Sequence, residues 1–210
     1  MLTDALYRTR KEAVMQNNMM FRAAGTVLTR LTKPGIPDKA VRKAVLAEYH
    51  AILDRAADIG SSNKLLMSYV LAAYFIAMCR CTGLTPEQNI ALLDQGIRGS
   101  KAVPMMLGNS KTYFSEKNME SRREWSRLTH EHHYANDWVV DVLEKTDDYQ
   151  FGLDYTECGV CKLCRDEGRP ELAHYLCTLD FMLVEVIGIH LKRTMTLADG
   201  GEKCDFRFQA

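Results

Sequence analysis

The sequence predicts an α+β fold in which a helical N-terminal half packs on a four-stranded antiparallel sheet that carries two inserted helices. The first observation is the spacing of apolar residues, which recur every three or four positions up to about residue 130 and every second position after about residue 135. The second is length, because 210 residues without a long linker suffice for one sizeable core. We therefore expect a helical region, 1–130, and a sheet region, 131–210, that form one compact unit.

The charge and hydropathy of the chain favour a soluble protein with a small-molecule partner. Lys and Arg number 27 and Asp and Glu also number 27, so that no net charge would attract nucleic acid or an acidic membrane. The longest apolar stretch, residues 70–79, is about half of the ~20 residues that cross a bilayer, and residues 1–18 lack the apolar core of a signal peptide. We therefore expect a cytoplasmic protein with reduced thiols, no membrane and no nucleic acid as partners, and leave a homodimer open.

Turn residues and caps divide the first region into five or six expected helices. A turn rich in Pro and Gly at 34–37 ends one helix, and the next begins near Asp38 and is closed by Gly60. Residues 61–83 are apolar on most sides, which predicts a central helix. The sequence TPEQ, residues 85–88, has the pattern of a capping box with Pro at the first helical position.

The second region predicts four strands, with two helices between the second strand and the third. Residues 137–158 form two strands joined by a polar turn at 145–148. A short helix then ends at Gly168, and Pro170 opens the second helix. The last hairpin, 187–208, turns at Asp-Gly-Gly and places three residues on one face of its second strand, namely Cys204, Phe206 and Phe208.

Three cysteines at spacings of three, Cys158, Cys161 and Cys164, form the first candidate site. Such a run can supply thiolates to an iron–sulfur cluster, but the fourth Cys followed by Pro is missing, since Cys177 is the next one. A zinc site is the second alternative. The favoured interpretation is one face of a helix, because residues three apart share a side and a free Cys packs as a small apolar group.

A group of histidines, His130, His132 and His133, surrounds Glu131. Histidines three apart on a helix can share a metal ion, but the His-Glu-x-x-His pattern of zinc proteases is absent. The alternative is a polar helix end or loop at the junction of the two regions. In that position the histidines could line the mouth of a pocket.

The predicted helix after Pro170 carries a polar line at successive spacings of three, formed by Glu171, His174, Cys177 and Asp180. Charged side chains are seldom buried without partners, so a thiol one turn from an Asp and a His on a packed helix suggests a working site. The alternative is ordinary surface polarity, with Glu171 favoured by the positive end of the helix dipole.

The last hairpin adds Arg193, Thr196, Cys204 and Asp205 as candidates. An Arg within an apolar alternation needs an acidic partner or an anionic ligand, because an isolated buried charge is costly. A substrate carboxylate is one such ligand. An ion pair with Asp205 or with Glu157 is the equal alternative.

Residues 155–208 resemble the signature region of the L-2-amino-thiazoline-4-carboxylic acid hydrolase family. The five shared elements are Glu-Cys after a strand, Pro-Glu-Leu followed by Cys-x-x-Asp, Arg-x-x-Thr, a Gly-rich turn and a final Cys-Asp-Phe-Arg-Phe. The same hairpin is more distantly similar to four-vinyl-reductase domains, whose zinc is held by Glu-x-x-Cys and a Cys eight residues later. Here Arg193 and Thr196 replace the first two ligands, and Cys204 alone remains in step.

The family resemblance implies a hydrolase that opens a C–N or C–S bond of a small cyclic amidine, a thiazoline carboxylate, and gives a carbamoyl-cysteine, with neither metal nor cofactor. It marks eight residues: Glu157, Cys158, Cys177, Asp180, Arg193, Thr196, Cys204 and Asp205. The alternative is a small-molecule- or metal-binding module of the four-vinyl-reductase type without catalysis.

Several roles are open under this hypothesis. Cys177 or Cys204 attacks the amidine carbon, or Asp180 or Glu157 activates a water molecule. Arg193 grips the substrate carboxylate and lowers the pKa of Cys204. The candidate proton carriers are His174 and His190.

Overall fold

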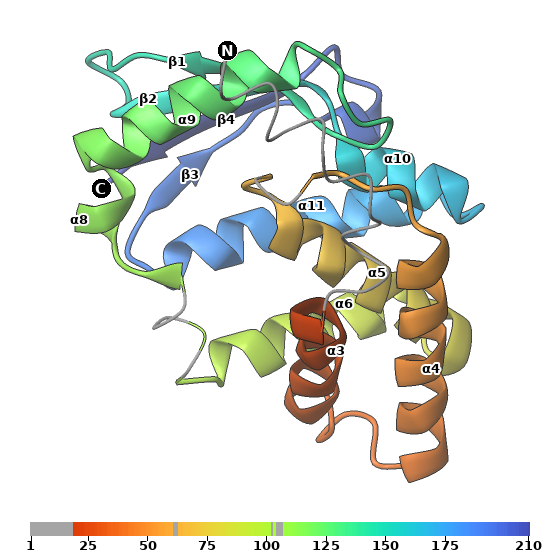
Figure 1. Cartoon of the computed structure of the whole chain (residues 1–210). Coiled ribbons are helices and arrows are strands. Elements are labelled where there is room, and N and C mark those ends of the chain that lie inside the picture. The colour runs from red at the N-terminus through yellow and green to blue at the C-terminus, as the bar shows by residue number, and fades with distance from the viewer. Residues whose placement is uncertain (1–18, 61–62, 102, 104–106) are drawn as a thin grey trace.

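The computed structural model describes residues 19–60, 63–101, 103 and 107–210 (Figure 1). This part of the chain consists of helices and one antiparallel sheet, which confirms the predicted α+β fold. The first region contains α3 (Met19–Leu31), α4 (Lys39–Arg55), α5 (Leu66–Cys81), α6 (Pro86–Arg98), α8 (Ser110–Tyr113) and α9 (Glu116–Thr129). The second contains β1 (Val139–Leu143), β2 (Phe151–Glu157), α10 (Gly159–Asp166), α11 (Leu172–Glu185), β3 (His190–Lys192), the 3-10 turn η1 (Leu197–Asp199) and β4 (Cys204–Gln209). The N-terminal stretch 1–18, on which the expectation about a signal peptide was based, lies outside the described residues.

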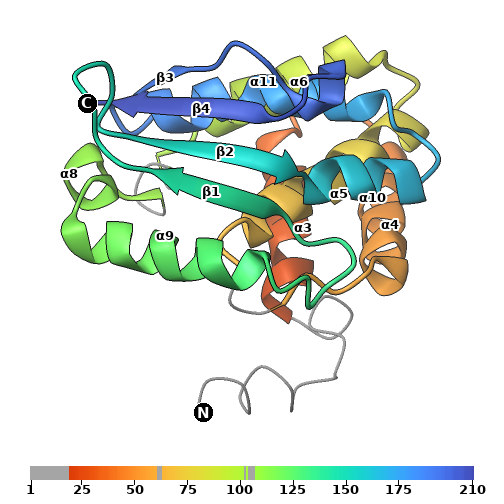
Figure 2. The same cartoon turned by 90° about the horizontal axis from the view of Figure 1, so that it is seen from above.

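The sheet has the strand order β1-β2-β4-β3, and each neighbouring pair is antiparallel (Figure 2). At its centre three pairs of residues from β2 and β4 lie opposite each other: Phe151 and Phe208, Leu153 and Phe206, Tyr155 and Cys204. Side chains alternate between the faces of a strand, so these six point to one face, which is apolar. The opposite face is charged, and there Asp154 forms an ion pair with Arg207 at 2.7 Å.

Helix α5 is the centre of the helical region, as the sequence predicts. Residues 69–78 of this helix are all buried. Helices α3, α4 and α6 contact α5, and so do α10 and α11 of the second region. Helix α11 lies between β3 and the pair α5 and α6, while α9 runs beside the edge strand β1 (Figures 1 and 2). Within the described ranges, every helix is too short or too polar to cross a membrane.

Local sequence signals set most helix ends. The Asp38 side chain accepts a hydrogen bond from the backbone N–H of Ala40 at 2.7 Å and caps α4. The capping box of Thr85 and Gln88 is present at the start of α6, as predicted. Helix α4 ends at Arg55, earlier than the Gly60 that the sequence favours, because the backbone is already extended at residue 56.

The last hairpin differs from the prediction, because its first strand has three residues and does not continue to Thr196. The backbone N–H groups of Thr194 and Met195 donate to Asp205 Oδ1 at 2.8 Å each, so a side chain takes the place of the strand partner. Thr196 then starts the 3-10 turn η1, and its hydroxyl donates to Asp199 Oδ2 at 2.6 Å. Arg193 therefore follows the strand and is not part of a long apolar alternation.

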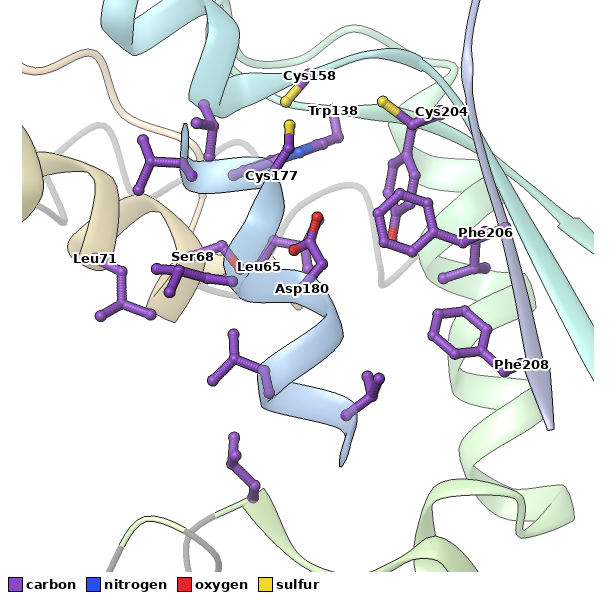
Figure 3. A pocket seen from close by; sticks show the side chains of 18 of the residues that line it. Leu65, Ser68, Leu71, Trp138, Cys158, Cys177, Asp180, Cys204, Phe206 and Phe208 are labelled. Atoms are coloured by element: carbon purple, nitrogen blue, oxygen red, sulfur yellow. The ribbon is translucent and has the colours of Figure 1, made fainter. Parts of the chain in front are cut away.

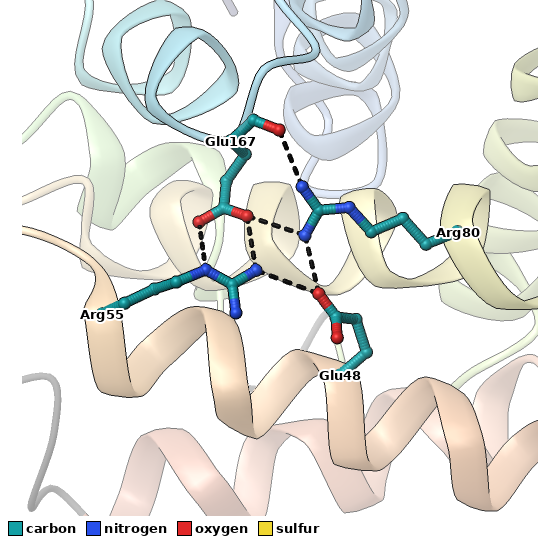
Figure 4. A network of polar contacts seen from close by, with 4 residues as sticks. All are labelled: Glu48, Arg55, Arg80 and Glu167. Atoms are coloured by element: carbon teal, nitrogen blue, oxygen red, sulfur yellow. Dashed lines mark hydrogen bonds and ion pairs between the residues drawn. The ribbon is translucent and has the colours of Figure 1, made fainter.

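An ion network joins the end of α10 to α4 and α5 (Figure 4). The Glu167 side chain is 5% exposed and accepts hydrogen bonds from Arg55 at 2.9 and 2.5 Å and from Arg80 at 2.7 Å. Glu48 contacts the same two guanidinium groups at 2.9 and 2.6 Å. Because Glu167 directly follows α10, the network fixes the position of that helix against the helical region.

Candidate active site

A cavity of about 260 Å³ lies between the apolar face of the sheet and helices α5 and α11, next to the start of α10 (Figure 3). Its wall is mainly aliphatic and aromatic. The side chains in the wall that carry a polar or reactive atom besides the Trp138 indole are Ser68, Tyr113, Tyr155, Asp180 and three cysteines, Cys158, Cys177 and Cys204. Four of the eight residues that the family resemblance marks therefore line one cavity.

Two elements of regular structure bring most of these groups together. Cys177 and Asp180 are three residues apart on α11, so they project from the same side of the helix. On β4, Cys204, Phe206 and Phe208 all line the cavity, which confirms the shared face that the sequence predicts. Figure 3 shows the three sulfur atoms at one end of the cavity and the Asp180 carboxylate directed into the space between α11 and the sheet.

Cys158 stands at the junction of β2 and α10. It has an extended backbone, with φ −126° and ψ 117°, and is the N-cap residue of α10. Gly159 follows because the chain passes very close to Trp138 there: a Cβ atom on Gly159 would lie 2.5 Å from the Asn136 carbonyl oxygen and 2.7 Å from the Trp138 ring. A side chain at this position would displace the start of α10, and the thiol with it.

The pKa of the Cys158 thiol is lowered. The Cys161 thiol beside it is the largest cause, and the backbone N–H groups of Cys161 and Val160 add to it, against the opposing effects of burial and of the Asp180 charge. These two N–H groups belong to the first turn of α10, where the backbone lacks helical partners and the helix dipole favours a negative charge. Cys158 is thus the thiol in the cavity that ionises most readily.

Burial has the opposite effect on the other two thiols of the cavity. It raises the pKa of Cys177, and the Asp180 carboxylate raises it further. It raises the pKa of Cys204 to about 11, although the backbone N–H of Leu197 donates to this sulfur at 3.2 Å. Arg193 acts to lower the pKa of Cys204, as expected, but desolvation outweighs the attraction of that guanidinium and the net shift is upward.

Asp180 forms an ion pair with Arg193, whose guanidinium lies outside the cavity. Arg193 Nη1 donates to Asp180 Oδ2 at 2.7 Å, and Nη2 donates to the carbonyl oxygen of Cys177 at 2.9 Å. The guanidinium also lies over the rings of Phe181 and Phe206, and the Arg193 side chain is 7% exposed. Its partner is therefore Asp180, and neither Asp205 nor Glu157 as the sequence suggested. Arg193 borders a second, more open hollow and does not line the cavity.

The second oxygen of Asp180 remains available on the cavity side. Within the described part of the chain, no group donates a hydrogen bond to Asp180 Oδ1. Burial raises the pKa of this carboxyl to about 6, even though the charge of Arg193 and its hydrogen bond act to lower it. A carboxyl with such a pKa can exchange a proton close to neutral pH.

The remaining marked residues lie outside the cavity. Glu157 pairs with Lys162, and Asp205 is bonded to the backbone of the hairpin. Thr196 is buried beside the second hollow, and His174, which is exposed, contacts Asp199 at 2.6 Å. Their catalytic or binding roles stay predictions, and their contacts here are with the protein itself.

The histidine group is exposed and apart from the cavity. His130 contacts Asp141 at 3.0 Å, His133 contacts Glu131 at 2.6 Å, and His132 lies 3.8 Å from Glu157. In the described residues, no three side chains of His, Cys, Asp or Glu are placed to hold one metal ion. Cys164, the last of the three cysteines at spacings of three, is fully buried in the core, as the helix-face interpretation expects.

Sequence reasoning missed the aromatic and aliphatic part of the site. Trp138, Tyr113 and Ser68 line the cavity from elements that carry no reactive pattern. It listed Cys158 among the marked residues without ranking it above the other cysteines, although a signal was present: a Cys directly before a predicted helix occupies the N-cap position, close to N–H groups that lack helical partners.

The fold and the cavity define a small α+β protein with three thiols and a carboxyl group in an apolar pocket. The profile of the L-2-amino-thiazoline-4-carboxylic acid hydrolase family matches residues 63–208, so the chain belongs to this family. The match begins before α5, which corrects the expectation that the likeness is close over the last fifty residues or so alone. It gives no support to a four-vinyl-reductase likeness. Comparison with curated proteins and with solved structures found no match.

Proposed function

We propose that the protein is a hydrolase that opens a ring bond of a small cyclic amidine, with Cys158 as the nucleophile and Asp180 as the group that binds and moves the proton. The observation that carries this proposal is the pairing, in one cavity, of a thiol whose pKa is lowered and a carboxyl that has one free oxygen. Membership of the family supports the reaction class.

The substrate would be bound through its amidine. Cyclic amidines are bases and are protonated near neutral pH, so their N–H groups are donors that match the free oxygen of Asp180. The bond to Asp180 would hold the positive charge next to the amidine carbon, which makes that carbon more electrophilic. Arg193 keeps Asp180 in place through its own bond to Oδ2.

The reaction would then proceed in two stages. The Cys158 thiolate forms a C–S bond to the amidine carbon, and the C=N electrons move to nitrogen. The tetrahedral adduct collapses and a ring C–N or C–S bond breaks; Asp180 takes a proton from the amidine nitrogen, on which the C=N bond re-forms, and passes it to the leaving atom. Water then adds to the carbon bound to Cys158, one of its protons goes to the C=N nitrogen and the other to Asp180, and the C–S bond to the enzyme breaks, which releases a carbamoyl product and restores the thiolate; Asp180 loses its proton to solvent.

Cys177 and Cys204 have no nucleophilic role in this scheme. Their pKa values are raised, so they remain neutral thiols that complete the wall. Of the cysteines that the sequence left open as nucleophiles, the proposal keeps Cys158 alone.

The test is an assay of the purified protein with a panel of 2-amino-thiazolines, followed by mass spectrometry for products that have gained one water. Cys158→Ser should lower the rate at least about a thousandfold. Cys81→Ser is the matched control, since this partly buried thiol at the end of α5 does not line the cavity. Full activity of Cys158→Ser would exclude the covalent route, and failure to open any ring in the panel would leave a binding protein.

A further inference from the structure

The start of α10 places a second thiol next to Cys158. Cys158 and Cys161 are separated by Gly159 and Val160, and the backbone N–H of Lys162 donates to the Cys158 carbonyl oxygen at 3.0 Å, which closes the first helical turn. Residues three apart in such a turn lie on one side of the helix. The two thiols contact each other, and this contact is the largest influence on the pKa of each.

Both thiols are reduced and within reach of small reagents. All seven cysteines of the chain are free, and Cys158 and Cys161 are each partly exposed. Cys164, the next one at the same spacing, is fully buried in the core. A small oxidant can therefore reach the pair Cys158 and Cys161 at the edge of the cavity.

The two thiols differ in acidity, which gives them different chemical roles. The neighbouring Cys158 sulfur and burial raise the pKa of Cys161, whereas the pKa of Cys158 is lowered. Within the described residues, no side-chain hydrogen bond caps the start of α10, so its N–H groups and the positive end of the helix dipole favour a thiolate at Cys158. A thiolate reacts with oxidants, and a neutral thiol next to it can attack the oxidised product.

The other two thiols of the cavity are poorer partners for Cys158. Figure 3 shows the sulfur atoms of Cys177 and Cys204 at the same end of the cavity, but Cys158 affects their pKa values through its charge and not through a hydrogen bond. They belong to α11 and β4, so a disulfide with either would have to draw separate packed elements together. A bond to Cys161 stays within one helical turn and closes a very short loop.

We propose that Cys158 and Cys161 form a redox-active dithiol that hydrogen peroxide converts into a disulfide. The chain order β2, Cys-Gly-Val-Cys, α10 agrees with the order of strand, Cys-x-x-Cys and helix in dithiol redox motifs. The disulfide itself does not depend on the proposed function. Its effect on catalysis does, because a Cys158 sulfur bonded to Cys161 is no longer a nucleophile and ring opening would stop.

The oxidation consumes one peroxide and two thiol groups. The Cys158 thiolate attacks one peroxide oxygen, the O–O bond breaks, and Cys158 becomes a sulfenic acid while hydroxide leaves and takes a proton from solvent. The Cys161 sulfur then attacks the Cys158 sulfur, an S–S bond forms, and the Cys161 proton leaves with the hydroxyl group as water. The two sulfur atoms lose two electrons, and the peroxide gains them. A dithiol such as dithiothreitol reverses the oxidation by thiol–disulfide exchange.

The test treats the reduced, purified protein with hydrogen peroxide, alkylates the remaining thiols and digests the protein with trypsin. The tryptic peptide 146–162 contains Cys158 and Cys161 and no other cysteine. We expect most of this peptide to escape alkylation and to be lighter by two hydrogen atoms, and dithiothreitol to restore both alkylation sites. A peptide that stays reduced, or that is linked to the peptide of Cys177 or Cys204, would overturn the proposal.

Two variants isolate the role of Cys161. Cys161→Ser keeps a hydroxyl donor beside Cys158, but peroxide should oxidise Cys158 to its sulfinic acid, so the Cys158 that dithiothreitol recovers for alkylation should fall at least about tenfold below wild type. Cys164→Ala is the matched control, since it removes the other thiol three residues from Cys161 and should leave the disulfide unchanged. Equal recovery of Cys158 in wild type and in Cys161→Ser would count against the pair. Circular dichroism would verify that each variant is folded.

The activity of the wild type separates this proposal from the proposed function. If both hold, peroxide should lower the rate of ring opening at least about tenfold, and dithiothreitol should restore it. If the disulfide forms while hydrolysis continues at the full rate, the dithiol stands and Cys158 is not the nucleophile. If the peptide stays reduced and Cys158→Ser is inactive, the proposed function stands and the dithiol is excluded.

Discussion

Asp137 offers the sharpest quantitative prediction, because it is a buried carboxylate whose ionisation opposes folding. It is 6% exposed and lies two residues before β1, next to Trp138 of the cavity wall. Its Oδ1 accepts hydrogen bonds from the backbone N–H of Trp138 at 2.7 Å and from the Asn63 side chain at 2.5 Å. Burial nevertheless raises its pKa from 3.8 to about 6. The change to test is Asp137→Asn, which retains an oxygen acceptor and removes the charge.

The expected magnitude follows from the two pKa values. At 1.36 kcal/mol for each pH unit between 3.8 and about 6, the ionised Asp137 costs about 3 kcal/mol of folding free energy at pH 7. The folded state binds the proton more tightly than the unfolded state. Protonation of Asp137 therefore contributes fully to the free energy of unfolding of the wild type below about pH 4, and this contribution is lost as the pH rises through 6. Asp137→Asn should therefore be more stable by up to about 3 kcal/mol at pH 7, with the gain vanishing near pH 4.

The assay is urea unfolding followed by circular dichroism between pH 4 and pH 7.5. Asp180 adds a similar pH dependence to both proteins and cancels in the difference. Asp141→Asn is the matched control, because this carboxylate of β1 is 54% exposed and should change the unfolding free energy by less than about 0.5 kcal/mol. A loss of stability in Asp137→Asn that is the same at every pH would refute the reasoning.

Two more predictions concern thiol reactivity and the ion network. At pH 7 iodoacetamide should alkylate Cys158 before the other cavity thiols, as peptide mass spectrometry would reveal; faster labelling of Cys177 would contradict the order of their pKa values. Glu167→Ala should lower the unfolding free energy by about 2 kcal/mol in urea titrations, since it leaves Arg55 and Arg80 with Glu48 alone. Glu116→Ala, which breaks an exposed pair, should have an effect below about 0.5 kcal/mol, and similar losses in both variants would count against the network.

The sequence predicted the elements well where the signal is local. A helix or a strand is encoded by apolar spacing and by caps within a few residues, which is why α5, the capping box at Thr85 and the two strands on either side of residues 145–148 were found. The prediction of a strand that continues to Thr196 was wrong, and the cause is again a local interaction. The Asp205 side chain competes for backbone N–H groups, and an alternating pattern does not reveal that competition.

The candidate site was predicted in part. The resemblance marked Cys158, Cys177, Asp180 and Cys204, and these four line the cavity. It placed Arg193 with them as an anchor, but the tertiary structure assigns that guanidinium to Asp180. Charge alone could not decide between several acidic partners.

The sequence by itself determined the order of helices and strands, the residues that carry reactive atoms and the family to which the chain is similar. The tertiary structure alone decided which of these atoms share a cavity, which thiol is acidic and that the cavity wall contains no cation among its described residues. The reason is that the pKa values depend on desolvation and on charges from other elements, and both arise only when distant segments pack together.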